Sequence, residues 1–336
     1  MRIGVNPEID KKIASDAYHR VIIPIYVPHF DDYFKNGLEV TKLCLESVIK
    51  TSHEQCRITV VNNGSCSRVS EYLQELYNSG RIDQLVLQKE NLGKVDAMMQ
   101  IARTASEPLI TLSDGDVLFL DGWIQATEKV FESFPEAGMV SPVPHGTTYG
   151  QYTTNTLFDA FFKGLLEFRS VSDPGDMLRF AESIGRGDSM YEKDICLKYQ
   201  LTVNRNDQTA VVGCGHFVAT MRREVFEYAP NENSKLAYAS DADREYIDIP
   251  NEKAGLWRLA TTGNYAYHMG NNPQTWMREK FIALRGDGKE KRSIPQARRW
   301  NLPLAFKRFV NRLWLNKYVR PYVFKRLGLK EGAREY

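Results

Sequence analysis

The stretch Pro108-Leu109-Ile110-Thr111-Leu112-Ser113-Asp114-Gly115-Asp116 decides which fold this chain of 336 residues is expected to adopt. Its first part is mostly apolar or β-branched, which is typical of a short buried strand. Asp114 and Asp116 follow, and because side chains alternate along a strand, they are expected to point the same way. Two such carboxylates repel each other unless a cation lies between them, and oxygen ligands suit Mg²⁺ or Mn²⁺. The alternative is a pair of solvated aspartates before a helix.

The chain before this stretch repeats a strand followed by an amphipathic helix. The predicted strands are 21–27, 57–61 and 85–87, and short connections join them to their helices. This order predicts a parallel sheet covered by helices on both faces. Ligands bind such sheets outside the carboxyl ends of the strands. Tyr26, the pair Asn62-Asn63 and the two aspartates all stand at such ends.

Composition limits the class of protein. Apolar residues make up 43% and charged residues 26% of the chain, and the net charge is +2, so nothing indicates a nucleic-acid partner. No segment reaches the roughly 20 apolar residues that span a membrane, and the N-terminus lacks the apolar core of a signal peptide. Five cysteines without a Cys-x-x-Cys pair indicate reduced thiols. A cytoplasmic location is therefore expected.

An ordered set of motifs resembles the family 2 inverting glycosyltransferases with the GT-A fold. The matching pieces are 21–26, 60–65, Asn91-Leu92-Gly93-Lys94, 112–116, 213–224, Asp241-Ala242-Asp243 and Tyr267-His268. They cover roughly residues 20–270, apart from an unmatched middle at 145–210. There is no Gly-x-Gly-x-x-Gly after the first strand, as an ordinary dinucleotide fold would have.

The resemblance implies the fold and its division. The fold is a GT-A (Rossmann-like) α/β fold with a mixed, mainly parallel sheet flanked by helices. Residues 1–275 would form the catalytic domain, with a nucleotide-binding half at 20–144 and an acceptor-side half at 145–275. Residues 276–336 would be a basic, helical, amphipathic C-terminal extension. Within the middle segment, 157–168 has the spacing of a helix.

The resemblance also implies an activity: inverting transfer of a sugar from a nucleotide-diphosphate sugar to an acceptor hydroxyl. The acceptor would be a glycan or a lipid-linked sugar, as in cell-surface polysaccharide or glycolipid synthesis. A UDP-sugar is favoured over a GDP-sugar as the donor, with Mn²⁺ or Mg²⁺ as the metal. The alternative function is a non-catalytic protein that binds a nucleotide sugar or a carbohydrate and is anchored by its basic tail.

By this resemblance, Asp116 and His268 bind the metal, and Asp114 contacts the ribose or the metal. The alternative for His268 is a histidine at a strand end with a satisfied hydrogen bond. Asp241 is the predicted general base, which takes the proton of the acceptor hydroxyl, and Asp243 is its competitor. The alternative for Asp243 is a charge near a helix N-terminus.

Six further residues are candidates for the donor site. They lie at strand ends or loops and offer a ring, an amide, an ammonium group or space for a ligand: Pro24, Tyr26, Asn62, Asn63, Lys94 and Gly213. Tyr26 is placed to stack on the base, and the asparagine amides suit a nucleobase edge or a ribose. The structural alternatives are a turn for the asparagines and a helix start for Lys94.

The C-terminal segment is strongly basic. Residues 278–330 hold 16 Lys or Arg against three acidic residues, and 295–330 contain no acid. Bulky apolar residues recur at helical spacing through 302–314. Such a segment either lies on an anionic membrane, through 296–330 on the inner face, or packs on the catalytic domain with its basic face in water. The sequence does not indicate an oligomeric state.

Overall fold

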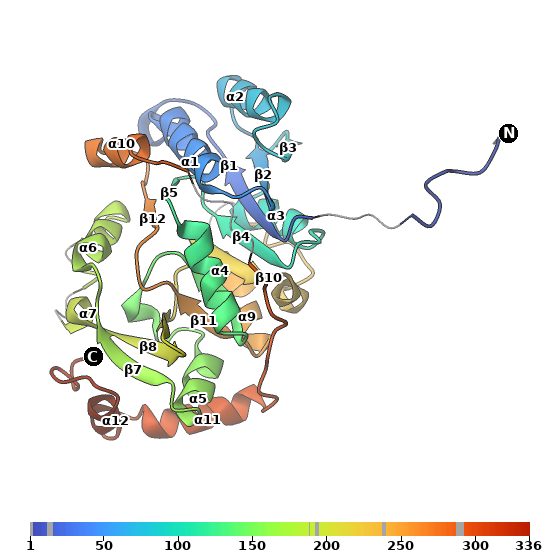
Figure 1. Cartoon of the computed structure of the whole chain (residues 1–336). Coiled ribbons are helices and arrows are strands. Elements are labelled where there is room, and N and C mark those ends of the chain that lie inside the picture. The colour runs from blue at the N-terminus through green and yellow to red at the C-terminus, as the bar shows by residue number, and fades with distance from the viewer. Residues whose placement is uncertain (1–2, 12–15, 188, 192–194, 237–239, 287–291) are drawn as a thin grey trace.

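The computed structural model describes residues 3–11, 16–187, 189–191, 195–236, 240–286 and 292–336. A ten-stranded sheet runs through the molecule, with helices on both faces (Figure 1). The strand order is β3-β2-β1-β4-β10-β6-β11-β9-β8-β7. Their bounds are β1 His19–Ile25, β2 Cys56–Asn63, β3 Gln84–Gln88, β4 Leu109–Ser113, β6 Ala137–Ser141, β7 Leu166–Ser170, β8 Tyr199–Arg205, β9 Gln208–Val212, β10 Val218–Arg222 and β11 Trp257–Ala260. This arrangement confirms the predicted α/β fold, a mixed sheet flanked by helices.

Most helices lie between the strands in chain order. Their bounds are α1 Gly37–Thr51, α2 Ser67–Asn78, α3 Lys94–Ala102, α4 Trp123–Ser133, α5 Thr154–Phe162, α6 Pro174–Ser183, α7 Ile195–Lys198, α8 Ser240–Asp243, α9 Ile249–Lys253, α10 Thr275–Ile282, α11 Leu304–Trp314 and α12 Arg320–Arg326.

Strands β3, β2, β1 and β4 pair in parallel. In β1 the side chains alternate between two cores, as a strand buried on both faces requires. Val21 and Ile23 pack in one core with Leu45 of α1. Ile22 packs in the other core with Met98 of α3. The two helices therefore cover opposite faces, and this part of the sheet has the architecture predicted from the strand–helix repeats.

The second half of the sheet is mixed. β10 runs antiparallel between β4 and β6, and β7, β8 and β9 form an antiparallel meander. The helix expected over 157–168 is wrong beyond Phe162. Gly164 has a left-handed φ of +66°, which stops the helix, and β7 begins at Leu166.

The C-terminal residues belong to the core of this second half. Trp314 of α11 stacks on Phe161 of α5, with 4.7 Å between the ring centroids. Phe324, Leu329 and Tyr336 are buried in the same core cluster as strands β7 and β8. The inner face of the C-terminal segment therefore packs on the part of the molecule that contains α5, β7 and β8, as in the alternative in which this segment packs on the domain.

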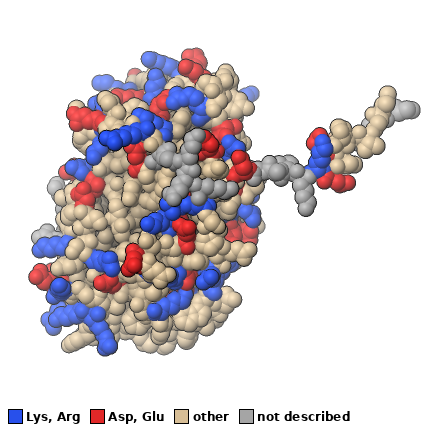
Figure 2. Space-filling model, in the orientation of Figure 1, with Lys and Arg blue, Asp and Glu red and all other residues tan. Residues whose placement is uncertain are grey.

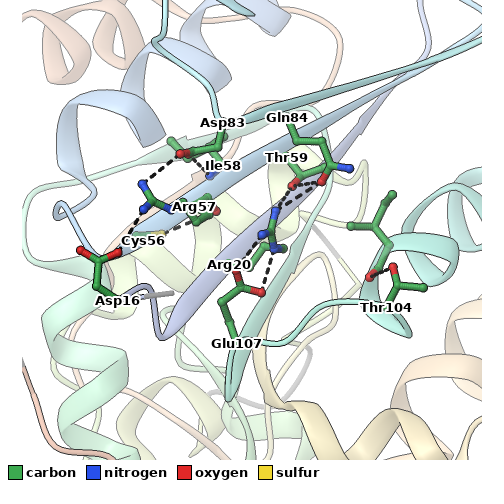
Figure 3. Close-up of polar contacts among 11 residues, drawn as sticks. Asp16, Arg20, Cys56, Arg57, Ile58, Thr59, Asp83, Gln84, Thr104 and Glu107 are labelled. Atoms are coloured by element: carbon green, nitrogen blue, oxygen red, sulfur yellow. Dashed lines mark hydrogen bonds and ion pairs between the residues drawn. The ribbon is translucent and has the colours of Figure 1, made fainter. Parts of the chain in front are cut away.

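The amino ends of the parallel strands are held by ion pairs. Figure 3 shows Arg20 of β1 between Glu107, Thr59 and Gln84. The guanidinium group donates 2.9 Å and 2.6 Å bonds to the Glu107 carboxylate and a 2.6 Å bond to Thr59 Oγ1. Because Glu107 precedes β4 and Thr59 lies in β2, Arg20 joins three neighbouring strands at the end opposite the aspartates.

Candidate active site at the carboxyl end of the sheet

Asp114 and Asp116 follow β4 in a tight turn. The Asp114 amide donates to the carbonyl oxygen of Phe217 at 2.8 Å, and the Asp116 carbonyl accepts from the Met269 amide at 2.8 Å. A Cβ at Gly115 would lie 2.9 Å from the carbonyl oxygen of Pro24 and 2.9 Å from Ile25 Cδ1. Only glycine fits this approach to β1 without a shift. The Asp-Gly-Asp sequence therefore places both carboxylates at the end of the sheet.

A small second sheet brings His268 to the same point. Strand β5 (Val117–Phe119) pairs antiparallel with β12 (Ala266–His268), and His268 lies opposite Val117. Its Nε2 is 3.3 Å from Asp116 Oδ2. One ligand atom from each of Asp114, Asp116 and His268 lies within 4.8 Å of the others. The three residues predicted to bind a metal are therefore brought together.

The tautomer of His268 follows from its neighbour Ser183, at the end of α6. The Ser183 hydroxyl donates its hydrogen to the carbonyl of Phe180 at 2.7 Å. Its oxygen can then only accept a hydrogen bond from His268 Nδ1, which is 3.1 Å away. A neutral His268 therefore carries its hydrogen on Nδ1 and turns the Nε2 lone pair toward Asp116, which is how a metal-binding histidine is held.

Asp116 is incompletely satisfied by the protein. Its Oδ1 is buried and has no hydrogen-bond partner among the described residues. Burial raises the pKa of the Asp116 carboxyl against the opposing effect of His268, and the negative charge of Asp114 raises it further. A divalent cation would supply the missing partner for the orphaned oxygen and the lone pair. The three side chains therefore fit a hard or borderline cation such as Mg²⁺ or Mn²⁺.

Lys94, the first residue of α3, joins this triad to a second acidic group. Its Nζ lies 2.6 Å from Asp114 Oδ1 and 3.2 Å from Asp243 Oδ1. Burial lowers the pKa of Lys94, but the charges of Asp114 and Asp243 outweigh it and raise the pKa overall. Lys94 is therefore charged at neutral pH, and it holds Asp114 and Asp243 on either side of one ammonium group.

Asp243 is the first of a series of charged side chains that contact one another. His216 Nε2 is 3.8 Å from Asp243 Oδ2, and His216 Nδ1 is 3.2 Å from Asp248 Oδ2. Asp248 in turn pairs with the buried Arg258 at 2.9 Å. Burial raises the pKa of the Asp243 carboxyl although Lys94 opposes this. Burial lowers the pKa of His216, but the hydrogen bond to Asp248 and the negative charges of Asp248 and Asp243 together outweigh burial and raise the pKa.

Asp241 lies apart from these contacts. Its side chain is 73% exposed and pairs with Arg244 at 3.2 Å, whereas the Asp243 side chain is only 4% exposed. Both residues belong to the short helix α8, in which positions two apart do not face the same way. The general-base assignment of Asp241 stays a prediction, and the structure gives its competitor Asp243 the position beside Lys94.

The two asparagines at the end of β2 are buried and bonded within the protein. Asn62 donates to Ser70 Oγ at 2.8 Å and accepts from the Ser65 amide at 2.9 Å. Asn63 donates to Asn91 Oδ1 at 2.8 Å and accepts from the Leu92 amide at 2.9 Å. These bonds give both residues the turn-forming role that was the structural alternative. Their contact with a nucleotide stays a prediction.

The remaining donor-site candidates differ in exposure. Tyr26, directly after β1, is 39% exposed and touches Phe34 edge to face. Pro24 is buried inside β1, where its carbonyl faces Gly115. Gly213 has a φ of +92°, and a Cβ there would lie 2.6 Å from Thr148 Oγ1. Packing therefore already requires a glycine at position 213, and only Tyr26 of these three presents an exposed side chain.

The sequence did not predict Ser183 and Asp248, which contact His268 and His216 in the structure, or Arg258, which pairs with Asp248. Ser183 lies in the segment that matched no motif, and a single serine at a helix end carries no signal for a role beside His268. Asp248 and Arg258 are separated from His216 by tens of residues, so their contact depends on the tertiary fold. His216 itself was visible in the sequence between Gly215 and Phe217, next to the glycine-rich end of β9.

Among the solved structures that the chain resembles are two glycosyltransferase-type neighbours of low sequence identity, PcManGT and TarS. One is the mannosyltransferase PcManGT from Pyrobaculum calidifontis in complex with GDP-Man and Mn²⁺, with a TM-score of 0.45, 15% identity, and coverage of 92% of this chain and 72% of that one. The other is S. aureus TarS 1–349, with a TM-score of 0.44, 10% identity, and coverage of 91% and 74%. At TM-scores below 0.5, neither likeness bears on the activity of this chain.

Comparison of sequences is more informative. An uncharacterized glycosyltransferase of Rickettsia bellii (strain RML369-C) is 30% identical over 122 residues, which cover 36% of this chain and 16% of that protein. The chain thus matches only a small part of that relative's length. The family described as glycosyl transferase family 2 matches residues 33–229, more than half of the chain, including Asp114, Asp116 and Lys94. On this match, the chain belongs to glycosyl transferase family 2.

Proposed function

We propose that the chain is a metal-dependent inverting glycosyltransferase that moves a sugar from a nucleotide-diphosphate donor to an acceptor hydroxyl. The observation that carries the metal is the triad of Asp114, Asp116 and His268, with an orphaned carboxylate oxygen and an oriented imidazole lone pair. A divalent cation held there supplies Lewis-acid stabilisation of the leaving diphosphate. Family membership supports glycosyl transfer in general, and the inverting course and the metal are our proposals.

In this proposal, an aspartate carboxylate of the protein acts as the general base for the acceptor hydroxyl. In an inverting transfer, a base removes the hydroxyl proton as that oxygen attacks the anomeric carbon, and an aspartate performs this best when its pKa is raised toward the working pH. Asp241 is the base proposed from the sequence pattern. The buried position and raised pKa of Asp243 support the competitor, with Lys94 holding its carboxylate in place.

In this proposal, Lys94 connects the carboxylate near the donor with the carboxylate near the acceptor. Because its ammonium group contacts both Asp114 and Asp243, it fixes the distance between the donor-side and acceptor-side carboxylates. We infer that Lys94→Met would weaken donor binding and transfer together. Replacement of the exposed Lys35, a residue outside this cluster, is the matched control.

The test is a donor screen followed by two substitutions. UDP- and GDP-sugars are incubated with the protein, Mn²⁺ or Mg²⁺ and glycan or lipid-linked acceptors, and the products are identified by mass spectrometry and by the anomeric configuration in NMR. A UDP-sugar is the expected donor. Retention of the donor's anomeric configuration in the product, or transfer at full rate in EDTA, would refute the proposal.

Asp241→Asn and Asp243→Asn then identify the base. The variant of the true base should bind donor and Mn²⁺ with unchanged affinity by calorimetry and lose about 100-fold or more in kcat, since general-base catalysis contributes about 10²–10⁴-fold. The other variant serves as the control. If both keep full transfer, neither aspartate is the base.

A further inference from the structure

The C-terminal helix α11 buries Trp314 in the core, yet it also buries a lysine and leaves large apolar side chains on its outer side. Lys307 points inward, where its Nζ contacts Asp159 Oδ1 at 2.9 Å and Asn155 Oδ1 at 3.0 Å, and both charged side chains are fully buried. On the outer side, Phe306 is 48% and Phe309 59% exposed. A helix that only covers a core buries its apolar face and exposes its charges. The exposed phenylalanines therefore need another explanation.

Six exposed apolar residues lie in and around α11 and α12, and we call them the aromatic ridge: Leu302, Phe306, Phe309, Leu313, Tyr318 and Tyr322. Phe306, Phe309 and Leu313 are three and four positions apart, so they share one face of α11. Tyr318, which precedes α12, and Tyr322, which lies within it, are 71% and 75% exposed. Single exposed apolar residues are common, but several large ones on one helix face are typical of an interaction surface.

Basic side chains accompany the ridge. Arg312, Lys317, Lys325 and Arg326 are exposed, and residues 295–330 contain no aspartate or glutamate. Figure 1 places α11 and α12 along the lower edge of the molecule, and Figure 2 shows this edge in blue and tan. The positive charge is thus concentrated beside the apolar side chains.

We propose that the aromatic ridge docks the protein on the surface of an anionic membrane. The apolar side chains would enter the boundary between headgroups and acyl chains, while arginine and lysine would pair with lipid phosphates. No helix of the described residues is long and apolar enough to cross a membrane, so this contact is an interfacial one. A second copy fits less well, because two acid-free basic surfaces would face each other.

The position of the aromatic ridge determines which part of the protein would contact the membrane. The Phe168 amide of β7 donates to the carbonyl of Leu327, directly after α12, at 2.7 Å. β7 is the last strand of the sheet, and β3 of the nucleotide-binding half is the first. The membrane therefore contacts the acceptor-side half. This placement suits a lipid-linked acceptor if the proposed transfer holds, but the docking itself does not depend on transfer.

The experiment is flotation of the full chain with vesicles. Truncation is unsuitable because Trp314, Phe324 and Tyr336 belong to the core. Because Phe306 also packs edge to face on the buried Phe158, only Phe309 and Leu313 are replaced together by serine in the ridge variant. A second variant carries Arg312→Glu and Lys317→Glu. We expect the wild-type chain to float with phosphatidylcholine–phosphatidylglycerol vesicles and less with phosphatidylcholine alone. Each variant should bind about tenfold or more weakly, at an unchanged melting temperature.

A double variant at two exposed apolar residues elsewhere, Tyr77→Ser with Leu87→Ser, is the matched control and should float like the wild type. Equal flotation of the wild type and the ridge variant would overturn the proposal. So would a ridge-dependent dimer in sedimentation, or tight binding of a labelled oligonucleotide, without flotation. None of these readouts uses glycosyl transfer, so failure of the proposed activity would leave the result interpretable.

Discussion

Two triads of histidine and carboxylate lie at opposite ends of the same strands. The ligand atoms of His19, His53 and Glu128 come within 4.8 Å of one another, just as those of Asp114, Asp116 and His268 do. His19 pairs with Leu109, where β4 begins, and Asp114 follows the residue where β4 ends. Distances alone therefore do not distinguish a closed structural network from a site that is prepared for a ligand.

The difference is in how completely each carboxylate is satisfied. Glu128 accepts from His19 Nδ1 at 2.8 Å, from His53 Nε2 at 3.0 Å and from the Tyr18 hydroxyl at 2.8 Å. Burial raises the pKa of Glu128, but the histidine hydrogen bonds outweigh it and lower the pKa to about 2. The protein itself thus stabilises the Glu128 anion.

The Asp116 carboxylate, in contrast to that of Glu128, is not fully satisfied by the protein. Its pKa is raised by burial, and one of its oxygens lacks a hydrogen-bond partner among the described residues. A buried carboxylate that the fold does not satisfy costs stability, and such groups concentrate at functional sites. The opposite directions of the two pKa shifts support our proposal that the Asp116 triad binds a ligand, whereas the fold itself satisfies the Glu128 carboxylate.

Asp116→Ala should have the largest effect, which we expect on transfer and on the response to Mn²⁺ and not on the stability of the metal-free protein. We expect transfer to fall about 100-fold or more, because a metal contributes several kcal/mol to the leaving group and about 1.36 kcal/mol is tenfold in rate. Mn²⁺ should raise the melting temperature of the wild type but not of the variant. Steady-state kinetics and thermal melts measure both. Unchanged metal-dependent transfer in the variant would remove Asp116 from the site.

Glu128→Gln should have the largest effect on stability. The glutamine amide cannot accept from all three donors, and leaving buried donors unpaired costs about 2–4 kcal/mol in the free energy of unfolding. Urea unfolding in EDTA measures this, with Asp116→Asn as the matched isosteric control, for which we expect no loss. Equal losses in the two variants would mean that the triads do not differ as argued.

Much of this arrangement could be predicted from local sequence patterns. Short apolar, β-branched runs predicted β1 and β4, and the parallel strand order predicted that Tyr26, the asparagines and the two aspartates stand at one edge. The family resemblance added His268, which β12 does carry to Asp116. The strand-end positions follow from local strand patterns and the short strand–helix connections, whereas His268 was predicted only from the resemblance.

The rest depends on contacts between distant segments. Nothing local shows that Ser183 meets His268, that Lys94 bridges Asp114 and Asp243, or that Lys307 turns inward toward Asp159. The segment around Phe162 has apolar residues in both a helix and a strand, so periodicity alone did not reveal the turn at Gly164. The buried triad around Glu128 combines residues from three separate elements and left no motif.

Ser183→Ala tests the orientation of His268 with a smaller expected effect. Without the acceptor oxygen, the imidazole is free to rotate or change tautomer, and loss of such a supporting bond weakens metal binding about 10–100-fold. Calorimetric titration with Mn²⁺ measures the affinity, and Ser183→Thr, which keeps the hydroxyl, should restore most of it. If the alanine variant binds Mn²⁺ like the wild type, the hydrogen bond has no such role.

The smallest expected effect is an opposite pH dependence of stability at the two triads in the absence of metal. The folded-state pKa of Glu128 is depressed from 4.5 to about 2, so its contribution is complete above 4.5 and is lost as the pH falls toward 2. The pKa of Asp116 is raised above 3.8, so ionisation of Asp116 destabilises the fold as the pH rises above 3.8. The loss caused by Glu128→Gln should therefore shrink in acid, whereas any gain from Asp116→Asn should grow toward neutral pH. Urea unfolding in EDTA at about pH 4 and about pH 7 distinguishes them. For each variant, the quantity compared is its free energy of unfolding minus that of the wild type. If this difference changed with pH in the same direction for both variants, the assignment of one triad to the fold and the other to a ligand would be contradicted.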